Sequence, residues 1–255
     1  VLSHEEKEAG VALIDIGGGT TDLAIFKDGI IRHTAVIPFG GNVVTEDIKE
    51  GCSIIEKQAE LLKVKFGSAW PGENKENEIV SIPGLRGRDP KEISLKNLSK
   101  IIHARTVEII EQVYLEIKNY GHEDQKKKLI AGIVLTGGGS QLKHLKQLVE
   151  YVTGMDTRVG YPNEHLAGDT DKSVTSPLYA TAVGLVMDGL HRLRKNEPEN
   201  IEGELFNNDP HNEEGSNDDS ESSSDELKKE NKKIERESFL DKLTKNLQDF
   251  LDNAE

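Results

Sequence analysis

A short stretch near the start of the chain combines residue types that bind phosphate groups. It reads VALIDIGGGTTDLAIF, and its candidate ligand residues are Asp15, Gly17, Gly18, Gly19, Thr20 and Thr21. Glycine amides and threonine hydroxyls donate hydrogen bonds to phosphate oxygens, and a carboxylate can hold Mg²⁺ through water. The pattern predicts a phosphate site with a magnesium ion beside Asp15. The alternative is a tight turn that uses glycine only for its backbone freedom.

A second glycine triplet follows much later in the chain. It consists of Gly137, Gly138 and Gly139 in the run LTGGGSQL. The apolar residues before it predict a buried strand, and the stretch from Gln141 predicts a helix, whose N-terminus would favour a negatively charged ligand. Taken alone, the triplet fits a structural turn equally well. Two such loops in one domain indicate a clamp around a phosphorylated ligand.

Other reaction types find no support in the sequence motifs. The chain has no GxxxxGK[ST] P-loop, and IGGGTTD lacks the GxGxxG spacing of a dinucleotide site and leads into a strand. The histidines show no HExxH or HxxxH spacing, so a histidine-based metal site is not expected. Cys52 has no evident histidine partner and GxSxG is absent, which argues against covalent catalysis.

Hydrophobic periodicity predicts the elements that would position these loops. Strands are expected at residues 11–16, 21–27, 30–38 and 131–135, and helices at 53–66, 95–120 and 141–153. One more helix is expected after Ser176 as its N-cap, with Pro177 in its first turn. This order predicts a mixed α/β domain with an inserted subdomain.

The composition excludes some classes of protein. A formal net charge of −14 repels nucleic-acid phosphates, so no nucleic acid is expected as a partner. The single cysteine allows no intrachain disulfide, which is typical of a reducing compartment. No apolar run approaches the roughly 18 residues that span a bilayer. Because the first residue is Val1, we interpret the chain as a piece of a longer protein.

The C-terminal part has a different composition. Between residues 196 and 237, 15 acidic residues stand against 5 basic ones, which predicts a disordered, self-repelling linker. Residues 238–255 then carry apolar side chains at helical spacing: Phe239, Leu240, Leu243, Leu247, Phe250 and Leu251. They fall within an arc of about 120°, which predicts an amphipathic helix in the membrane surface. The alternative, a helix docked in a protein groove, gains support from the excess of acidic residues in this segment.

Together these motifs resemble those of the actin-like ATPase superfamily. Within it, the runs VIPFGGNVVTEDI, AELLKVKFGSA, IPGLRGRDPKEIS and SPLYATAVGL are similar to FtsA, the family of bacterial cell-division actin homologues. The resemblance covers nearly all of residues 1–195 and implies the second half of an actin-like ATPase fold. The implied parts are a nucleotide-binding subdomain at 1–41 and 121–195, an inserted subdomain at 42–120, the acidic linker at 196–237 and the membrane-targeting helix at 238–255.

The resemblance also implies roles for the site residues. Asp15 would hold Mg²⁺ through water, the first glycine loop with its threonines would cradle the phosphates of ATP, and Gly137, Gly138 and Gly139 would line the adenosine. Glu60 and Lys63 would reach the ribose, since both lie on one face of a predicted helix. An ordinary surface ion pair is the alternative for these two residues.

The function implied by the resemblance is that of a cell-division scaffold. Such a protein binds ATP, self-associates into actin-like filaments and tethers FtsZ filaments to the inner face of the cytoplasmic membrane at the division septum. The inserted subdomain would receive the C-terminal peptide of FtsZ. No catalytic residue is expected here, because those that orient water would lie in the first half of such a protein, so the chain would be at most a weak ATPase. The alternatives are a sugar kinase, a chaperone-type ATPase or a pilus-assembly actin homologue.

Overall fold

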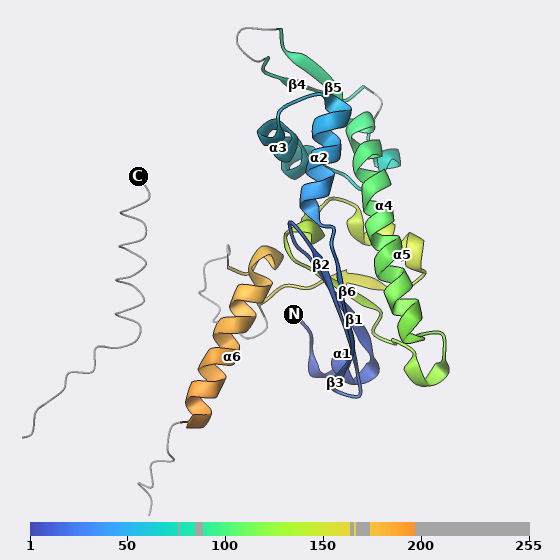
Figure 1. Cartoon of the computed structure of the whole chain (residues 1–255), viewed down its shortest axis with the longest axis vertical. Coiled ribbons are helices and arrows are strands. Elements are labelled where there is room, and N and C mark those ends of the chain that lie inside the picture. The colour runs from blue at the N-terminus through green and yellow to red at the C-terminus, as the bar shows by residue number, and fades with distance from the viewer. Residues whose placement is uncertain (76, 85–88, 164–165, 167–173, 197–255) are drawn as a thin grey trace, which may run out of the picture. The chain divides into compact units, whose positions relative to one another are not determined.

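The computed structural model describes residues 1–75, 77–84, 89–163, 166 and 174–196 (Figure 1). The chain divides into two units, Val1–Glu199 and Asn200–Glu255, and all described residues belong to the first. Almost all of the expected linker and the whole of the expected terminal helix, residues 197–255, lie outside the described residues.

A five-stranded mixed sheet forms the centre of the first unit. Its strands are β1 (Val11–Ile16), β2 (Thr21–Lys27), β3 (Ile30–Ile37), β6 (Ile133–Thr136) and β7 (Thr157–Val159). They lie in the order β3-β2-β1-β6-β7. The first three strands pair antiparallel, whereas β6 pairs parallel with both β1 and β7. The short Asp28-Gly29 turn between β2 and β3 is the expected hairpin connection, with positive φ at both residues.

Helices and a small second sheet complete the fold. The helices are α1 (His4–Ala9), α2 (Gly41–Cys52), α3 (Glu56–Phe66), α4 (Leu95–Tyr120), α5 (Leu145–Thr153) and α6 (Ala180–Asn196). Short 3-10 turns are η1 (Pro71–Glu73), η3 (Gln125–Lys127), η4 (Gly138–Gln141) and η5 (Pro177–Tyr179). The second sheet consists of β4 (Ile79–Ile82) and β5 (Lys91–Ser94), which pair antiparallel.

Two hydrophobic clusters meet along α4. The first packs one face of the main sheet against α5 and the C-terminal half of α4, through residues such as Ile14, Ile133 and Val113. The second packs α2, α3 and the β4–β5 sheet against the N-terminal half of α4, through residues such as Ile48 and Ile102. A helix of 26 residues is about 39 Å long, so it reaches both clusters. The mixed α/β class expected from the sequence is confirmed.

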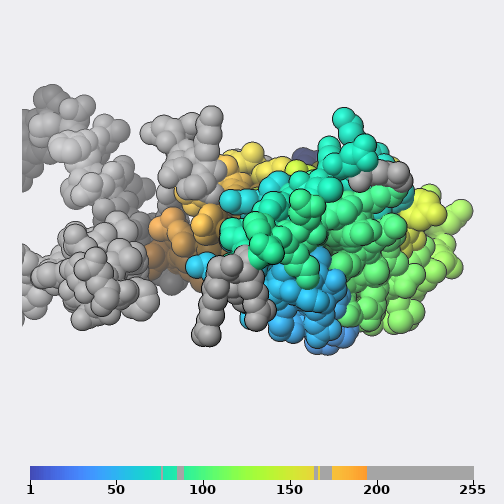
Figure 2. Space-filling model, turned by 90° about the horizontal axis from the view of Figure 1, so that it is seen from above, coloured from blue at the N-terminus to red at the C-terminus, as the bar shows by residue number. Residues whose placement is uncertain are grey.

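An ion pair joins α2 to α4, which lie side by side on the surface (Figure 2). Arg105 Nε lies 2.6 Å from Asp47 Oδ2, and Arg105 Nη2 donates to Asp47 Oδ1 at 3.0 Å. Asp47 raises the pKa of the Arg105 guanidinium above its ordinary value, mainly by accepting these hydrogen bonds. Such a two-pronged bond fixes the mutual orientation of the two helices.

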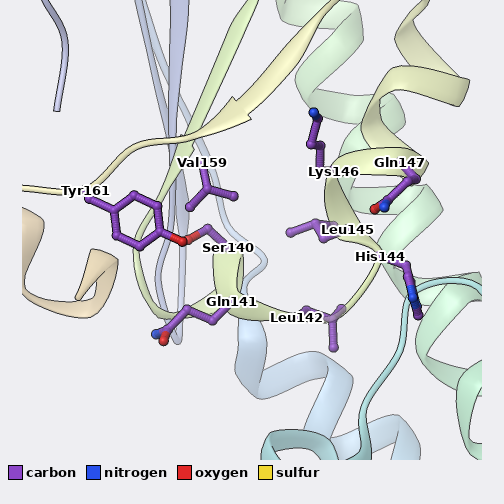
Figure 3. A pocket seen from close by; sticks show the side chains of 9 residues that line it. All are labelled: Ser140, Gln141, Leu142, His144, Leu145, Lys146, Gln147, Val159 and Tyr161. Atoms are coloured by element: carbon purple, nitrogen blue, oxygen red, sulfur yellow. The ribbon is translucent and has the colours of Figure 1, made fainter.

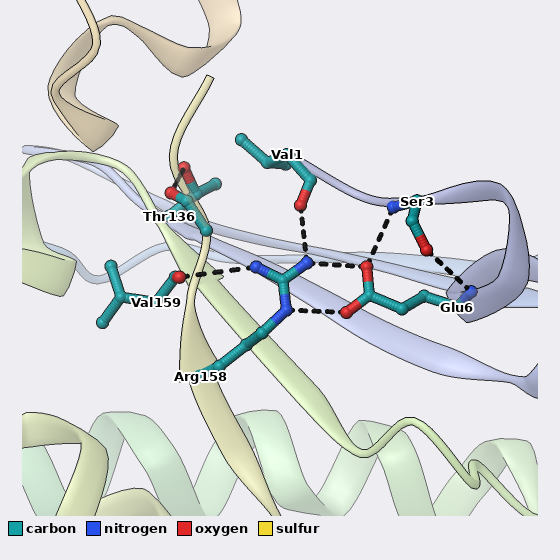
Figure 4. Close-up of polar contacts among 7 residues, drawn as sticks. Val1, Ser3, Glu6, Thr136, Arg158 and Val159 are labelled. Carbon is teal, nitrogen blue, oxygen red and sulfur yellow. Dashed lines mark hydrogen bonds and ion pairs between the residues drawn. The ribbon is translucent and has the colours of Figure 1, made fainter. Parts of the chain in front are cut away.

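A second ion pair ties the N-terminal segment to the edge of the main sheet (Figure 4). Arg158 on β7 donates from Nε and Nη2 to the two carboxylate oxygens of Glu6 on α1, both at 2.6 Å. Nη2 also donates to the carbonyl of Val1 at 2.8 Å. Glu6 in turn closes a capping box with Ser3 at the start of α1. These bonds hold α1 beside β7.

The structure confirms most expected elements and adds five helices and strands that were not predicted from the sequence. Strands β1 and β2 have the expected bounds, and β3 and β6 differ from them by one or two residues. The helix expected from Ser53 begins at Glu56, and the one expected from Gln141 begins at Leu145. The additions are α1, α2, the β4–β5 sheet and β7.

Candidate functional site

The first glycine loop joins β1 to β2 and lies against the N-terminus of α2. The amide of Gly41 donates to the carbonyl of Gly17 at 2.9 Å, and the amide of Asn42 donates to the carbonyl of Gly18 at 2.8 Å. These bonds use the first amides of α2, which have no partner within the helix. Gly40 permits this close approach, because a Cβ there would lie 2.6 Å from the Gly17 carbonyl oxygen. The loop is thereby fixed beside the end of the sheet.

Gly18 and Gly19 leave their backbone amides open. Neither residue has a positive φ, so the turn itself does not require glycine. Among the described residues, neither amide has a hydrogen-bond acceptor. A Cβ at Gly19 would meet nothing within 4 Å, and a Cβ at Gly18 would meet only the side chain of Asn42. Open amides beside free space fit a phosphate group, and the fold offers no other reason for glycine at position 19.

The two threonines after the triplet have different surroundings. Thr20 is exposed, and its hydroxyl donates to the carboxylate of Asp22 at 3.0 Å. Thr21 is fully buried, and its hydroxyl donates to the carbonyl of Phe39 at 2.8 Å. Thr20 therefore lies beside the candidate phosphate site, whereas Thr21 ties β2 to the segment that precedes α2.

Asp15 lies at the end of β1, close to a second carboxylate. It stands directly opposite Asp22 on β2, so both side chains are on the same face of the sheet. Adjacent like charges favour a bound cation. In the described part of the chain, no group of three His, Cys, Asp or Glu residues could hold a metal ion. An Mg²⁺ ion held by Asp15 through water would therefore take its direct ligands from phosphate oxygens and water, as this ion prefers.

The second glycine triplet packs closely against β1. A Cβ at Gly137 would lie 2.2 Å from Asp15 Oδ1, and a Cβ at Gly139 would lie 2.3 Å from Ile16 Cγ2. Gly137 also has a φ of 81°, in the region that favours glycine. Both positions thus have a structural reason to be glycine. The packing brings the two glycine loops together on either side of Asp15.

The turn after the second triplet differs from the expected helix start. Gly138 opens the 3-10 turn η4, and α5 begins only at Leu145. Lys143 forms an isolated bridge with Ser68, and His144 has a left-handed φ of 61°, so the chain cannot continue as one helix from Gln141. The expectation that a helix over residues 141–153 begins directly at this loop was therefore wrong.

Glu60 and Lys63 lie one turn apart on α3 and face the start of α2. Lys63 Nζ donates to the carbonyl of Gly41 at 2.8 Å and to the hydroxyl of Thr45 at 2.7 Å. It also lies 2.7 Å from the Glu60 carboxylate, which accepts a hydrogen bond from Thr45. The Lys63 side chain is only 16% exposed. The pair thus belongs to a network between two helices, beside the first glycine loop.

The network also sets the charge state of Glu60. Burial alone would raise the pKa of this carboxyl, but hydrogen bonds from Lys63 and Thr45 outweigh that effect and hold the pKa below its ordinary value. Glu60 therefore stays ionised at neutral pH. Its half-exposed carboxylate is available to accept a hydrogen bond from a ligand hydroxyl.

An open pocket of about 710 Å³ lies between α2 and α3. Its lining residues are Asn42, Thr45, Ile55, Glu56, Lys57, Glu60 and Leu61. Asn42 also packs on Gly18, so the pocket adjoins the first glycine loop. Sites for small molecules measure about 300 to 1,000 Å³, which includes this volume.

A smaller pocket of about 390 Å³ lies beside η4, α5 and β7 (Figure 3). Several of its polar groups already have partners within the protein. The hydroxyl of Ser140 donates to the Gly137 carbonyl at 2.7 Å, and His144 Nδ1 lies 2.9 Å from Ser68 Oγ. Lys146 forms an ion pair with Glu150. This pocket offers fewer free polar groups than the one between α2 and α3.

The structure thus brings most of the expected site residues to one end of the sheet. Gly18, Gly19 and Thr20 lie on the first loop, Asp15 lies at the end of β1 just before it, and Gly137 packs on Asp15. Sequence reasoning missed three neighbours, Asn42, Thr45 and Thr181. The GGN run before an apolar i, i+4 pattern was a signal for α2, whereas nothing local marks Thr181, whose contact with Asp15 joins distant parts of the chain.

Sequence comparison identifies relatives along most of the chain. Residues 12–184 match the family model for cell division protein FtsA. The cell division protein FtsA of Pseudomonas aeruginosa is 39% identical over 209 residues, which are 82% of this chain and 49% of that protein. The FtsA of Escherichia coli K12 is 38% identical over 193 residues, which are 74% and 46% of the two chains. The chain spans about half the length of these relatives.

Solved structures share the fold. MreB5 of Spiroplasma citri bound to ADP has a TM-score of 0.57 at 23% identity, over 75% of this chain and 57% of that one. A type IV pilus biogenesis complex of PilM and PilN has a TM-score of 0.55 at 19% identity, over 73% and 48%. The described part therefore has an actin-like fold, and the chain belongs to the FtsA family of cell division proteins.

Proposed function

We propose that this chain is part of an ATP-binding division scaffold that tethers FtsZ filaments to the inner face of the cytoplasmic membrane at the septum. Membership of the FtsA family supports the role in division. One structural observation carries the nucleotide part of the proposal. Glu60 lines the pocket between α2 and α3, and Asn42 connects this pocket to the open amides of the first loop, which follows Asp15 directly.

The phosphates of ATP would lie at the first loop. The amides of Gly18 and Gly19 and the Thr20 hydroxyl are the donors nearest to the free space there. A bound Mg²⁺ ion would neutralise charge on the phosphates, with Asp15 contacting its water shell. The Glu60 carboxylate would accept a hydrogen bond from the ribose, with Lys63 holding it in place. Solved structures of MreB5 with ADP and with AMPPNP, which share this fold, support a nucleotide as ligand.

The adenosine would lie near the second loop. Gly138 is the member of that triplet with the most room, since a Cβ there would meet only the end of the Leu178 side chain. Gly137 and Gly139 would contribute by keeping the loop close to β1. We propose no catalytic residue, because the side chains of the site, such as Asp15, Glu60 and Lys63, are suited to binding and positioning the ligand.

The remaining partners concern other parts of the chain. The inserted subdomain, residues 42–120, would receive the C-terminal peptide of FtsZ. Actin-like filament assembly is proposed by analogy with MamK, whose double helical filament shares the fold at a TM-score of 0.50. Residues 238–255 would lie in the membrane surface. No helix in the described ranges is long and apolar enough to cross a membrane.

The nucleotide site can be tested by following backbone amide signals of the ¹⁵N-labelled chain by NMR during titration with ATP and Mg²⁺. Because the chain spans about half of its relatives, it would supply one wall of the cleft, and we expect weak binding, on the order of millimolar. The signals of Gly18, Gly19, Asn42 and Glu60 should shift together. Shifts confined to the pocket beside η4 and α5, or no shifts at all, would contradict the proposal. A micromolar affinity would contradict the expectation that this chain supplies only one wall of the cleft.

A further inference from the structure

The start of α6 is bonded to Asp15 on β1, and the turn just before α6 is bonded to the second glycine loop. Thr181 Oγ1 donates to Asp15 Oδ2 at 2.8 Å, across 166 residues of sequence. Just before α6, the carbonyl of Pro177 accepts a hydrogen bond from the Gly137 amide at 3.2 Å. The start of α6 is therefore attached to the carboxylate that would face the metal ion and to the loop that packs on it.

The carboxylate of Asp15 is held between these two attachments. One oxygen accepts the hydrogen bond from Thr181, and the other lies against Gly137, where even a methyl group would not fit. A carboxylate oxygen can accept more than one hydrogen bond, so Oδ2 can bond Thr181 and a water of a metal shell together. Thr181 thus sets which way the carboxylate faces.

The rest of α6 makes little contact with the body of the first unit. Val183 is buried at 9% exposure and Met187 is partly buried, whereas four other large apolar side chains beyond Val183 are exposed at 53–69%: Leu185, Val186, Leu190 and Leu193. The attachment of the helix is therefore concentrated in its first turn. A change at that turn would move the whole helix, since few other contacts oppose it.

We propose that Thr181 is a positioning residue that orients Asp15 for the metal-nucleotide complex and couples occupancy of the site to α6. The inference rests on the proposed nucleotide site. Coupling of this kind is reciprocal: if bound Mg²⁺ and ATP favour one position of α6, fixing α6 in that position strengthens binding by the same factor. Thr181 is exposed, so the loss of its hydroxyl should leave the fold intact.

The test compares ATP affinity in the presence of Mg²⁺ with ATP affinity in the presence of EDTA, in four variants. The amide signals of Gly18 and Gly19 in NMR titrations measure the affinity. Thr181→Val and Thr181→Ala remove the hydroxyl, and Thr181→Ser keeps it. Thr34→Val is the matched control, because Thr34 is exposed on β3 and its hydroxyl has no partner among the described residues. The Gly184 amide, one turn after Thr181, reports on α6, and the Gly189 amide reports on its distant part.

We expect the gain in affinity from Mg²⁺ to fall about two- to tenfold in Thr181→Val and Thr181→Ala, the value of one hydrogen bond. The Gly184 signal should shift with Mg²⁺ and ATP in the unmodified chain and in Thr181→Ser, but not in the variants without the hydroxyl. An unchanged Mg²⁺ effect and Gly184 shift in Thr181→Val would overturn the inference while the nucleotide site stands. If Gly18 and Gly19 do not respond even in the unmodified chain, the proposed nucleotide site fails and the inference fails with it.

Discussion

The glycines around the first loop are glycine for different physical reasons, and alanine substitutions can distinguish these reasons. Gly40 allows the backbone of α2 to approach the loop, because a Cβ there would lie within 2.9 Å of three backbone atoms. Gly19 has open space around it and an ordinary backbone conformation. The first is required by the fold, whereas the second is explained by a ligand.

Alanine at Gly40 should therefore mainly lower stability, and alanine at Gly19 should mainly weaken ATP binding. Gly40→Ala should lower the free energy of unfolding by about 1–3 kcal/mol, because backbone atoms must shift. Gly19→Ala should change it by less than about 0.5 kcal/mol and weaken binding of ATP several-fold. Urea denaturation and the NMR titration measure the two effects. Gly189→Ala is the control for ATP binding, since Gly189 is also surrounded by open space; because Gly189 lies inside α6, alanine there should itself raise stability by up to about 1 kcal/mol. A stability loss in Gly19→Ala, or unchanged ATP binding, would contradict this assignment.

Among the elements, those with strong local patterns were predicted from the sequence. The strands β1, β2 and β3 are apolar runs separated by glycine-rich or Asp-Gly turns, and α4 is a long periodic stretch that ends at Gly121. The first glycine loop and Asp15 were found in the same way, because the residue types alone indicate their chemistry.

The elements that were not predicted have weaker local signals: α1 has a capping box but only six residues and no buried side chain, and the apolar pattern of α2 follows no capping side chain. Helix α2 begins at a glycine N-cap, with no side-chain cap and no acidic residue in its first turn. Strand β7 has three residues and is defined by its pairing with β6. The contacts of Asn42, Thr45 and Thr181 depend on the packing of α2, α3 and α6, so no spacing rule reveals them.

The link between α1 and β7 predicts a pH-dependent stability (Figure 4). The hydrogen bonds from Arg158 hold the pKa of Glu6 below the usual value of 4.5, despite an opposing effect of burial. A lowered pKa in the folded state means that the stabilisation is fully present above pH 4.5 and is lost as the pH falls through the folded-state pKa.

Glu6→Gln should therefore be less stable than the unmodified chain at neutral pH, and the difference should shrink in acid. Urea denaturation at about pH 6 and about pH 3.5 measures it. Glu8→Gln is the control on the same helix, because the Glu8 side chain is 67% exposed. A Glu6→Gln difference that is equal at both pH values would show that the ion pair is not its source.

For the molecule as a whole, we propose that a nucleotide-binding body is joined to a terminal segment that binds membrane. Full burial of two Phe and four Leu side chains would contribute about 1.5–3 kcal/mol each, so partial burial is enough for reversible binding. Because acidic residues outnumber basic ones in residues 238–255, binding should depend little on anionic lipid. A kinase of the same superfamily would have little use for such a segment.

The most direct test of the scaffold proposal is co-sedimentation of the chain with phospholipid vesicles, with and without residues 238–255. Leu247→Glu and Gln248→Glu form a matched pair, since they add the same charge at neighbouring positions, the first inside and the second outside the apolar arc of the expected helix. The account predicts that the full chain and Gln248→Glu sediment with vesicles, and that the truncated chain and Leu247→Glu stay in solution. Sedimentation that survives truncation, or a full chain that does not bind vesicles, would contradict it.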